Sequence, residues 1–270
     1  MVKPLGNEKC ARIDATGYAR LGAYAFTLLE LLVVIAVIAI LAALLLPVLS
    51  RVKVKVKTEN VRMEMGQIAT AINEYQSAFN RFPVSAEIAN SVAALEEDYT
   101  YGGTFYGATG KVTVAGPGAY LKDNHELMAV LLDLEYYGNG QPTINNGHVK
   151  NPQRTKYLSP HLAMDTNSAG VGPDGAYRDP WGLPYMITLD LNLDGTARDI
   201  FYRSPAISQD PGNPNQGLNG LVRKTDAQGN PTYEANVPVL VWSPGPDKHI
   251  NTDIKANLGE NKDNILSWKR

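Results

Sequence analysis

Residues 26–50 read FTLLELLVVIAVIAILAALLLPVLS, and this stretch decides the fold because nothing else in the chain is as apolar. No charged residue occurs within residues 31–49. At about 1.5 Å of rise per residue, a helix over this stretch covers most of the ~30 Å hydrocarbon thickness of a bilayer. The sequence therefore predicts a transmembrane helix over residues 26–50.

Two residues in this stretch are unusual for a membrane anchor. Glu30 places a carboxylate near the start of the apolar run, at a cost on the order of 2–3 kcal/mol if it reaches the helix centre in lipid. Two interpretations of Glu30 stay open: its carboxylate reaches the lipid headgroups, or it binds a partner cation. Pro47, near the other end, predicts a kink or a local opening of the helix.

A short polar leader precedes FTLLELL, and this arrangement closely resembles the processing site and N-terminal helix of type IV pilins and type II secretion pseudopilins. In these families a prepilin peptidase cuts before the Phe and methylates its new amino group. The resemblance implies a cleaved leader at residues 1–25 and a cut between Ala25 and Phe26. The family usually has Gly before the cut, where this chain has Ala25.

The same resemblance implies a role in assembly for Glu30. Cleavage creates a charged amine on Phe26, and a filament that stacks these helices brings that amine to Glu30 of a neighbouring subunit. This pairing neutralises two groups that are each costly in lipid. We therefore expect Glu30 to act between subunits.

Composition and charge describe a folded protein and exclude nucleic-acid binding as its main role. Of the 270 residues, 44% are hydrophobic and 19% are charged, as in ordinary folded domains. A net charge of −2 does not supply the basic surface that phosphate contacts require, so we expect no nucleic-acid partner. The single cysteine, Cys10, lies in the leader, so the processed chain can form no disulfide.

Basic residues flank the apolar stretch on both sides, and four of them alternate with valine in RVKVKVK at residues 51–57. The flanking charges are so evenly divided that they do not decide the orientation of the helix. The resemblance places the chain in the bacterial inner membrane as a single-pass protein with its C-terminal part in the periplasm. The RVKVKVK segment predicts a collar that is solvated or contacts lipid headgroups.

An amphipathic continuation of the helix is predicted over residues 51–83. Apolar residues recur there at spacings of four and three, at Val61, Met65, Ile68, Ile72, Tyr75 and Phe79. The helix should end near Asn80, because Pro83 restricts the residue before it to extended conformations. The resemblance implies an α+β, pilin-like fold, in which this helix packs on a small antiparallel sheet within a head of residues 84–270 that also carries long loops.

Several elements of the head are predicted by pattern. Residues 125–136 form a short amphipathic helix, and residues 237–243 form a strand. Residues 179–185, DPWGLPY, resemble the DPWGNPY segment that leads into the sheet of the major pseudopilin of type II secretion. Beyond them, alternating stretches at 186–191 and 198–202 around Asp194 and Gly195 predict a hairpin.

The predicted hairpin turn allows two interpretations. Asp190, Asn192, Asp194 and Gly195 match the first half of an EF-hand loop, but Phe201 stands where the bidentate Glu is expected. The segment is thus either a plain turn or a cation site.

The C-terminal segment after residue 243 resembles the calcium loop that closes the major pseudopilins. The resemblance and the oxygen-rich side chains imply a calcium site made by Ser243, Asp247, Asn251, Asp253 and Asp263. Only hard oxygen donors and one histidine are available there, which suits calcium better than zinc. A solvated acidic loop is the alternative interpretation.

No catalytic motif is found, and we therefore expect a structural protein rather than an enzyme. There is no Walker loop, no G-x-S-x-G sequence and no completed H-E-x-x-H. The resemblance implies a subunit of a type II secretion pseudopilus, with other pseudopilins, a prepilin peptidase and an inner-membrane platform with a cytoplasmic ATPase as partners. The alternative is a type IV pilin or minor pilin for adhesion, motility or DNA uptake.

Overall fold

The structure is a computed structural model that describes residues 27–93, 97–112, 114, 122–226 and 228–269. Two compact units divide the chain, Met1–Ser50 and Arg51–Arg270. The long helix α1 (Leu28–Phe79) contributes its first part to one unit and its second part to the other. The two units are described in turn.

The first unit consists, in its described part, of Thr27 and the apolar half of α1. Every residue from 27 to 50 is exposed within this unit. In this part of α1 the mean hydropathy reaches 3.3, and among the described residues α1 is the one helix long and apolar enough to cross a membrane. The helix continues through Pro47, and the Ser50 hydroxyl donates a hydrogen bond of 2.9 Å to the Pro47 carbonyl. Residues 27–50 therefore present an apolar surface that no other described residue of this unit covers.

In the second unit, α1 buries one face between Val61 and Tyr75. The buried side chains are Val61, Met65, Ile68, Ala71, Ile72 and Tyr75. They repeat every three or four residues, which confirms the predicted amphipathic stripe. The helix ends at Phe79, and Asn80 follows with a positive φ of 50° while its N–H still donates to the Gln76 carbonyl. The predicted stop near Asn80 is thus confirmed.

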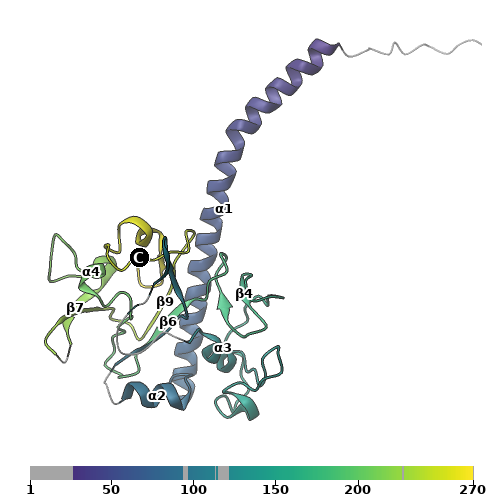
Figure 1. Cartoon of the computed structure of the whole chain (residues 1–270). Coiled ribbons are helices and arrows are strands. Elements are labelled where there is room, and N and C mark those ends of the chain that lie inside the picture. Colours follow the sequence, from purple (N-terminus) through teal and green to yellow (C-terminus); the bar gives the residue numbers. More distant parts are fainter. Residues whose placement is uncertain (1–26, 94–96, 113, 115–121, 227, 270) are drawn as a thin grey trace, which may run out of the picture. The chain divides into compact units, whose positions relative to one another are not determined.

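The core sheet has four antiparallel strands in the order β1 (Tyr99–Tyr101), β6 (Met186–Leu189), β9 (Val239–Ser243) and β10 (Ile265–Leu266). Because side chains alternate along a strand, Ile187 and Val241 share a hydrophobic cluster with α1. Met186 and Trp242 belong to a second cluster, which includes Phe201 and other residues of the segment before β7. The sheet is therefore buried on both faces, with α1 beside β6 and β9 as Figure 1 shows.

Short helices and two-stranded ribbons complete the unit. The helices are α2 (Ala86–Ala93), α3 (His125–Leu131) and α4 (Pro205–Ser208), with 3-10 turns at Asn146–His148, Leu218–Gly220 and Gly259–Asp263. The ribbons pair β2 (Phe105–Gly107) with β3 (Gly110–Val112), β4 (Gly170–Val171) with β5 (Tyr177–Arg178), and β7 (Val222–Thr225) with β8 (Pro231–Glu234). A long helix followed by small antiparallel sheets makes a mixed α+β structure consistent with a pilin-like fold, as predicted.

One predicted element is wrong. Residues 198–202 form no strand, and β6 pairs with β1 and β9 instead of forming a hairpin with them. The cause is Asp199, whose buried carboxylate accepts hydrogen bonds of 2.9 Å from the N–H groups of Phe201 and Tyr202 and so folds the chain into a turn. Local bonds of this kind compete with strand pairing. The predicted helix at 125–136 also ends early, at Leu131, and Asp133 has a φ of 55°.

Candidate functional site

The start of α1 is closed by a reciprocal pair of hydrogen bonds between Thr27 and Glu30. The Glu30 carboxylate accepts from the Thr27 N–H at 2.8 Å and from its hydroxyl at 2.9 Å, while the Glu30 N–H donates to the Thr27 hydroxyl oxygen at 3.2 Å. This is the capping-box arrangement of a helix N-terminus. The T-x-x-E spacing signals it in the sequence, yet Thr27 was not among the predicted functional residues. The predicted cleavage residues Ala25 and Phe26 lie outside the described residues.

The DPWGLPY segment is joined to the end of β9 by a buried hydrogen bond. The Ser243 hydroxyl donates to the Asp179 carboxylate at 2.5 Å and accepts from the Gly245 N–H at 3.0 Å. Asp179 also accepts from the N–H groups of Trp181 and Leu183 at 2.9 and 3.0 Å. Burial raises the pKa of Asp179 against the opposing effect of these bonds. Ser243, predicted as a metal ligand, therefore has its hydroxyl bound to Asp179.

The acidic loop after β9 brings Asp247 and Asp263 together. The Asp247 N–H donates to the Asp263 carboxylate at 3.4 Å, and burial, together with the neighbouring Asp247 charge, raises the pKa of Asp263. Gly245 makes this approach possible, because its φ is 79° and a Cβ there would lie 2.4 Å from the Asp263 carbonyl oxygen. One oxygen of Asp263 and one of Glu260 are buried without a hydrogen-bond partner.

The other predicted ligands have different surroundings. The Asn251 side-chain oxygen accepts from the Asp253 N–H at 2.9 Å, and the Asn251 N–H donates to Asn261 at 2.8 Å. Asp253 is exposed. Within the described part of the chain, no three His, Cys, Asp or Glu side chains converge to hold a metal ion. Of the five predicted ligands, the structure brings Asp247 and Asp263 together.

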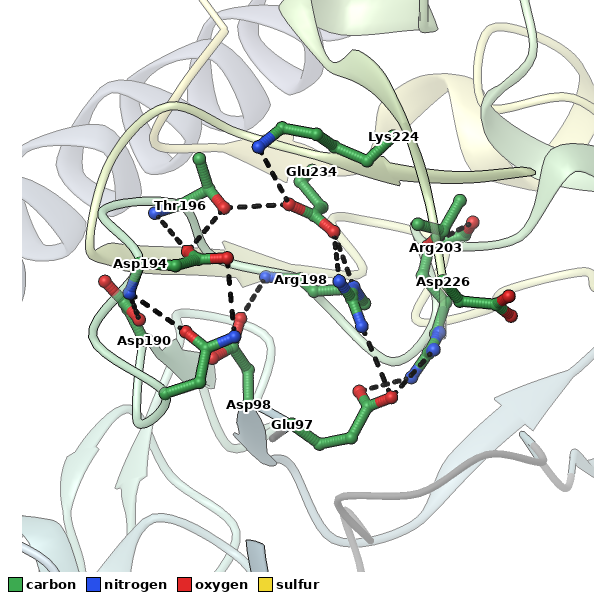
Figure 2. A network of polar contacts seen from close by, with 12 residues as sticks. Glu97, Asp98, Asp190, Asp194, Thr196, Arg198, Arg203, Lys224, Asp226 and Glu234 are labelled. Carbon is green, nitrogen blue, oxygen red and sulfur yellow. Dashed lines mark hydrogen bonds and ion pairs between the residues drawn. The ribbon is translucent and has the colours of Figure 1, made fainter. Parts of the chain in front are cut away.

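The alternative cation site, in the loop after β6, is built into a polar network that Figure 2 shows. Asp190 accepts from the N–H groups of Asp194 and Gly195 at 3.2 and 2.8 Å. Asp194 in turn accepts from the N–H and hydroxyl of Thr196 at 2.8 and 2.7 Å. These bonds close the turn with groups of the chain itself.

Asp98 enters the same network from a distant part of the sequence. Its carboxylate accepts from the N–H groups of Leu191 at 3.1 Å and Arg198 at 2.7 Å. Burial raises the pKa of Asp98 to about 7, and the charges of Asp190 and Asp194 add to this. Sequence spacing gave no signal for Asp98, which lies about a hundred residues before its partner Arg198.

A chain of alternating charges continues from this loop across the unit. Arg198 lies between Glu234, at 2.5 Å, and Glu97, at 3.2 Å, and Arg203 contacts the other oxygen of Glu97 at 3.0 Å (Figure 2). All four side chains are at most 15% exposed. Their charges are therefore matched within the unit, so we interpret the network as a structural link between β8, the segment before α4 and the start of β1.

Comparison with known families identifies the N-terminal signal. Residues 22–46 match the prokaryotic N-terminal methylation motif. This is the type IV pilin/pseudopilin signal, and in this chain a long apolar helix follows it, so the resemblance predicted for the N-terminal segment is confirmed. Comparison with curated proteins and with solved structures found no match.

The motif supports one class of protein. It supports a pilin-like or pseudopilin precursor that prepilin peptidase processes, and it implies assembly into filaments. Together with the apolar part of α1 it suggests a single-pass membrane anchor.

Proposed function

We propose that the chain is a structural subunit of a type II secretion pseudopilus, a periplasmic fibre on the inner membrane that helps to export proteins. The observation that carries this proposal is the hydrogen bond between Asp179 and Ser243. It joins DPWGLPY to the beginning of the acidic loop, and both stretches resemble the major pseudopilin. The two segments that resemble the major pseudopilin are thus joined by one buried hydrogen bond in the C-terminal part of the unit.

The subunit acts mechanically and is not an enzyme. Its partners are other pseudopilins in the fibre, the prepilin peptidase and an inner-membrane platform with a cytoplasmic ATPase that supplies the work. The exposed apolar surface of residues 27–50 supports this role, because a helix that the described residues leave uncovered can bind lipid before assembly and neighbouring helices afterwards.

Calcium in the acidic loop is part of the proposal. Asp247 and Asp263 would contribute ligands to the ion, because they provide hard oxygens and one Asp263 oxygen is buried without a hydrogen-bond partner. The ion would neutralise carboxylates that repel each other. The residues would then keep the loop closed between β9 and β10.

A type IV pilin or minor pilin is the second candidate. It is favoured by the ribbon β7–β8 and the turns around it, which enlarge the unit at residues 203–236. An enlarged head suits a specialised subunit of a filament. A pilin and a pseudopilin share the same processing and the same N-terminal assembly helix. The two candidates therefore differ only in the cellular role of the filament.

Two measurements test the proposal in the native host. The mass of the N-terminal peptide from membranes should correspond to a chain that begins at N-methylated Phe26. Deletion of the gene should leave secreted proteins in the periplasm while surface filaments, motility and DNA uptake persist. Loss of surface filaments with normal secretion would favour the second candidate, and unprocessed protein in the presence of active peptidase would contradict both.

A further inference from the structure

The four basic residues of the RVKVKVK segment surround α1 and do not lie on one face. We define Arg51, Lys53, Lys55 and Lys57 as the basic collar. At about 100° per residue, Arg51 and Lys55 lie about 40° apart on one side, and Lys53 and Lys57 lie as close together about 200° away. All seven residues from 51 to 57 are exposed. The segment is therefore positively charged on two opposite sides.

Nothing in the described part of the chain neutralises this charge. No member of the collar forms an ion pair with a described residue, and the next acidic side chain along the helix, Glu59, contacts Arg62 at 4.0 Å. Lys57 alone has a polar partner: it donates to the Pro180 carbonyl at 3.0 Å and lies 6.0 Å from the centre of the Trp181 ring. Like charges four residues apart on a helix repel each other. The collar thus weakens its own helix unless an anionic partner is present.

Exposed valines separate the cations. Val52, Val54 and Val56 are between 42% and 54% exposed. A partner of the collar therefore offers both anionic and apolar surface. The border between lipid headgroups and acyl chains has this character, because long basic side chains reach phosphate groups while short apolar ones remain in the hydrocarbon.

We propose that the basic collar binds the phosphate groups of anionic phospholipids. These lipids belong to the leaflet at the C-terminal end of the membrane-spanning part of α1, next to residue 51. A helix lying flat on a membrane needs its cations on one face, whereas a helix that crosses the headgroup layer meets phosphates on all sides. The collar has the second distribution. The proposal depends on residues 28–50 spanning the membrane and not on whether the filament serves secretion or a pilus. Each basic residue near an anionic surface raises the affinity by a factor of about five.

The test uses the full chain reconstituted in equal amounts of phosphatidylcholine and phosphatidylglycerol. After extraction in mild detergent, the lipids that remain bound are counted by mass spectrometry. Wild type should retain several-fold more phosphatidylglycerol than phosphatidylcholine. The variant R51Q/K53Q/K55Q/K57Q should show the bulk ratio, because Gln removes the charge and keeps a good helix former. R51Q/K53Q/K55Q, which keeps the Lys57 contact to Pro180, should lose most of the preference.

The matched control K111Q/R154Q/K156Q/K262Q removes four exposed cations elsewhere in the unit and should behave as wild type. The proposal would be overturned if wild type retained the two lipids in their bulk ratio. It would also be overturned if the control variant lost the preference for phosphatidylglycerol to the same extent as the collar variant. Displacement of phosphatidylglycerol by millimolar inorganic phosphate would identify a free anion as the ligand instead. Unchanged lipid binding with reduced cross-linking between chains in the collar variant would assign the collar to an acidic surface of a second copy.

Discussion

The hydroxyl of Tyr185 donates a hydrogen bond to the carboxylate of Glu64, and this bond ties the end of DPWGLPY to the middle of α1. Tyr185 is fully buried and packs edge-on against Tyr177, with ring centres 5.2 Å apart. Burial raises the pKa of Glu64, since the helix carries this carboxylate into the interface with the head. One polar contact thus fixes the rotational position of the helix against β5 and β6.

Tyr185→Phe should lower the free energy of unfolding by about 1–3 kcal/mol, because it leaves a half-buried carboxylate without its donor. Urea titration of the unit Arg51–Arg270 measures the loss. The exposed Tyr136→Phe is the control and should change little. In a double-mutant cycle, Tyr185→Phe should cost much less in a Glu64→Leu background, which removes the acceptor, and full additivity would show that the two groups are not coupled.

The raised pKa of Asp98 predicts a pH dependence of stability. Because its folded-state pKa is about 7, well above 3.8, the folded state disfavours the ionised carboxylate. The contribution of Asp98 to stability is therefore complete below about pH 4 and is lost as the pH rises through 7, with a slope of up to about 1.4 kcal/mol per pH unit. The unfolding free energy of wild type should fall relative to Asp98→Asn across this range.

Asp98→Asn also loses an acceptor for one of two N–H groups, so only the change of the difference with pH is informative. The exposed Asp165→Asn serves as control. Hydrogen bonds from the Asn167 N–H and from Ser168 lower the pKa of Asp165, the opposite direction to Asp98. A difference between wild type and Asp98→Asn that stays constant from pH 4 to 8 would contradict the prediction.

Two roles are open for the Glu30 carboxylate. It caps the helix through Thr27 in its own chain, and in a filament we expect it to pair with the Phe26 amine of a neighbouring subunit. Glu30→Gln separates the two roles, because Gln still accepts the Thr27 N–H in a capping box but carries no charge. If charge pairing drives assembly, Glu30→Gln and Glu30→Leu should both reduce filament yield while Thr27→Val does not. Filament counts by electron microscopy after equal expression provide the measurement. Normal filaments from Glu30→Gln with loss in Thr27→Val would assign Glu30 to helix capping.

Calcium should stabilise the folded unit if the acidic loop binds it. An ion that binds only the folded state at about 100 times its Kd adds roughly 2.7 kcal/mol, which raises the melting temperature. Magnesium should do much less, since it demands a tighter octahedral shell. Asp247→Ala and Asp263→Ala should each abolish the shift.

Asp190→Ala distinguishes the two loops in the same thermal assay. If it alone removed the calcium response, the ion would lie in the turn after β6, among Asp98, Asp190 and Asp194. Equal melting temperatures in calcium, magnesium and chelator would show that neither loop binds the ion. Protease sensitivity after Ser243 in chelator gives an independent readout of the acidic loop.

The sequence predicted α1 closely because its signals are local: an apolar run, a repeat of three and four, and Pro83 after the last turn. The strand around Trp242 was predicted for the same reason. The bond between Ser243 and Asp179 and the entry of Asp98 into the loop after β6 could not be predicted, since they depend on how distant segments meet. The strand predicted at 198–202 is wrong for a different reason. The sequence there alternates as a strand does, but the Asp199 carboxylate accepts the N–H groups of Phe201 and Tyr202, which are then not available for strand pairing.

The order β1-β6-β9-β10 also has a consequence for the timing of folding. The central strands β6 and β9 can pair only after residue 243 has been synthesised, and the edge strand β10 can join them only after residue 266. The hydrogen bond from the Arg198 N–H to Asp98 joins residues that are a hundred positions apart. Contacts this distant make folding slow compared with helix formation. The α1 stripe therefore lacks its β9 partners, among them Val241, until synthesis has passed β9, so the core that covers the helix is completed only near the C-terminus.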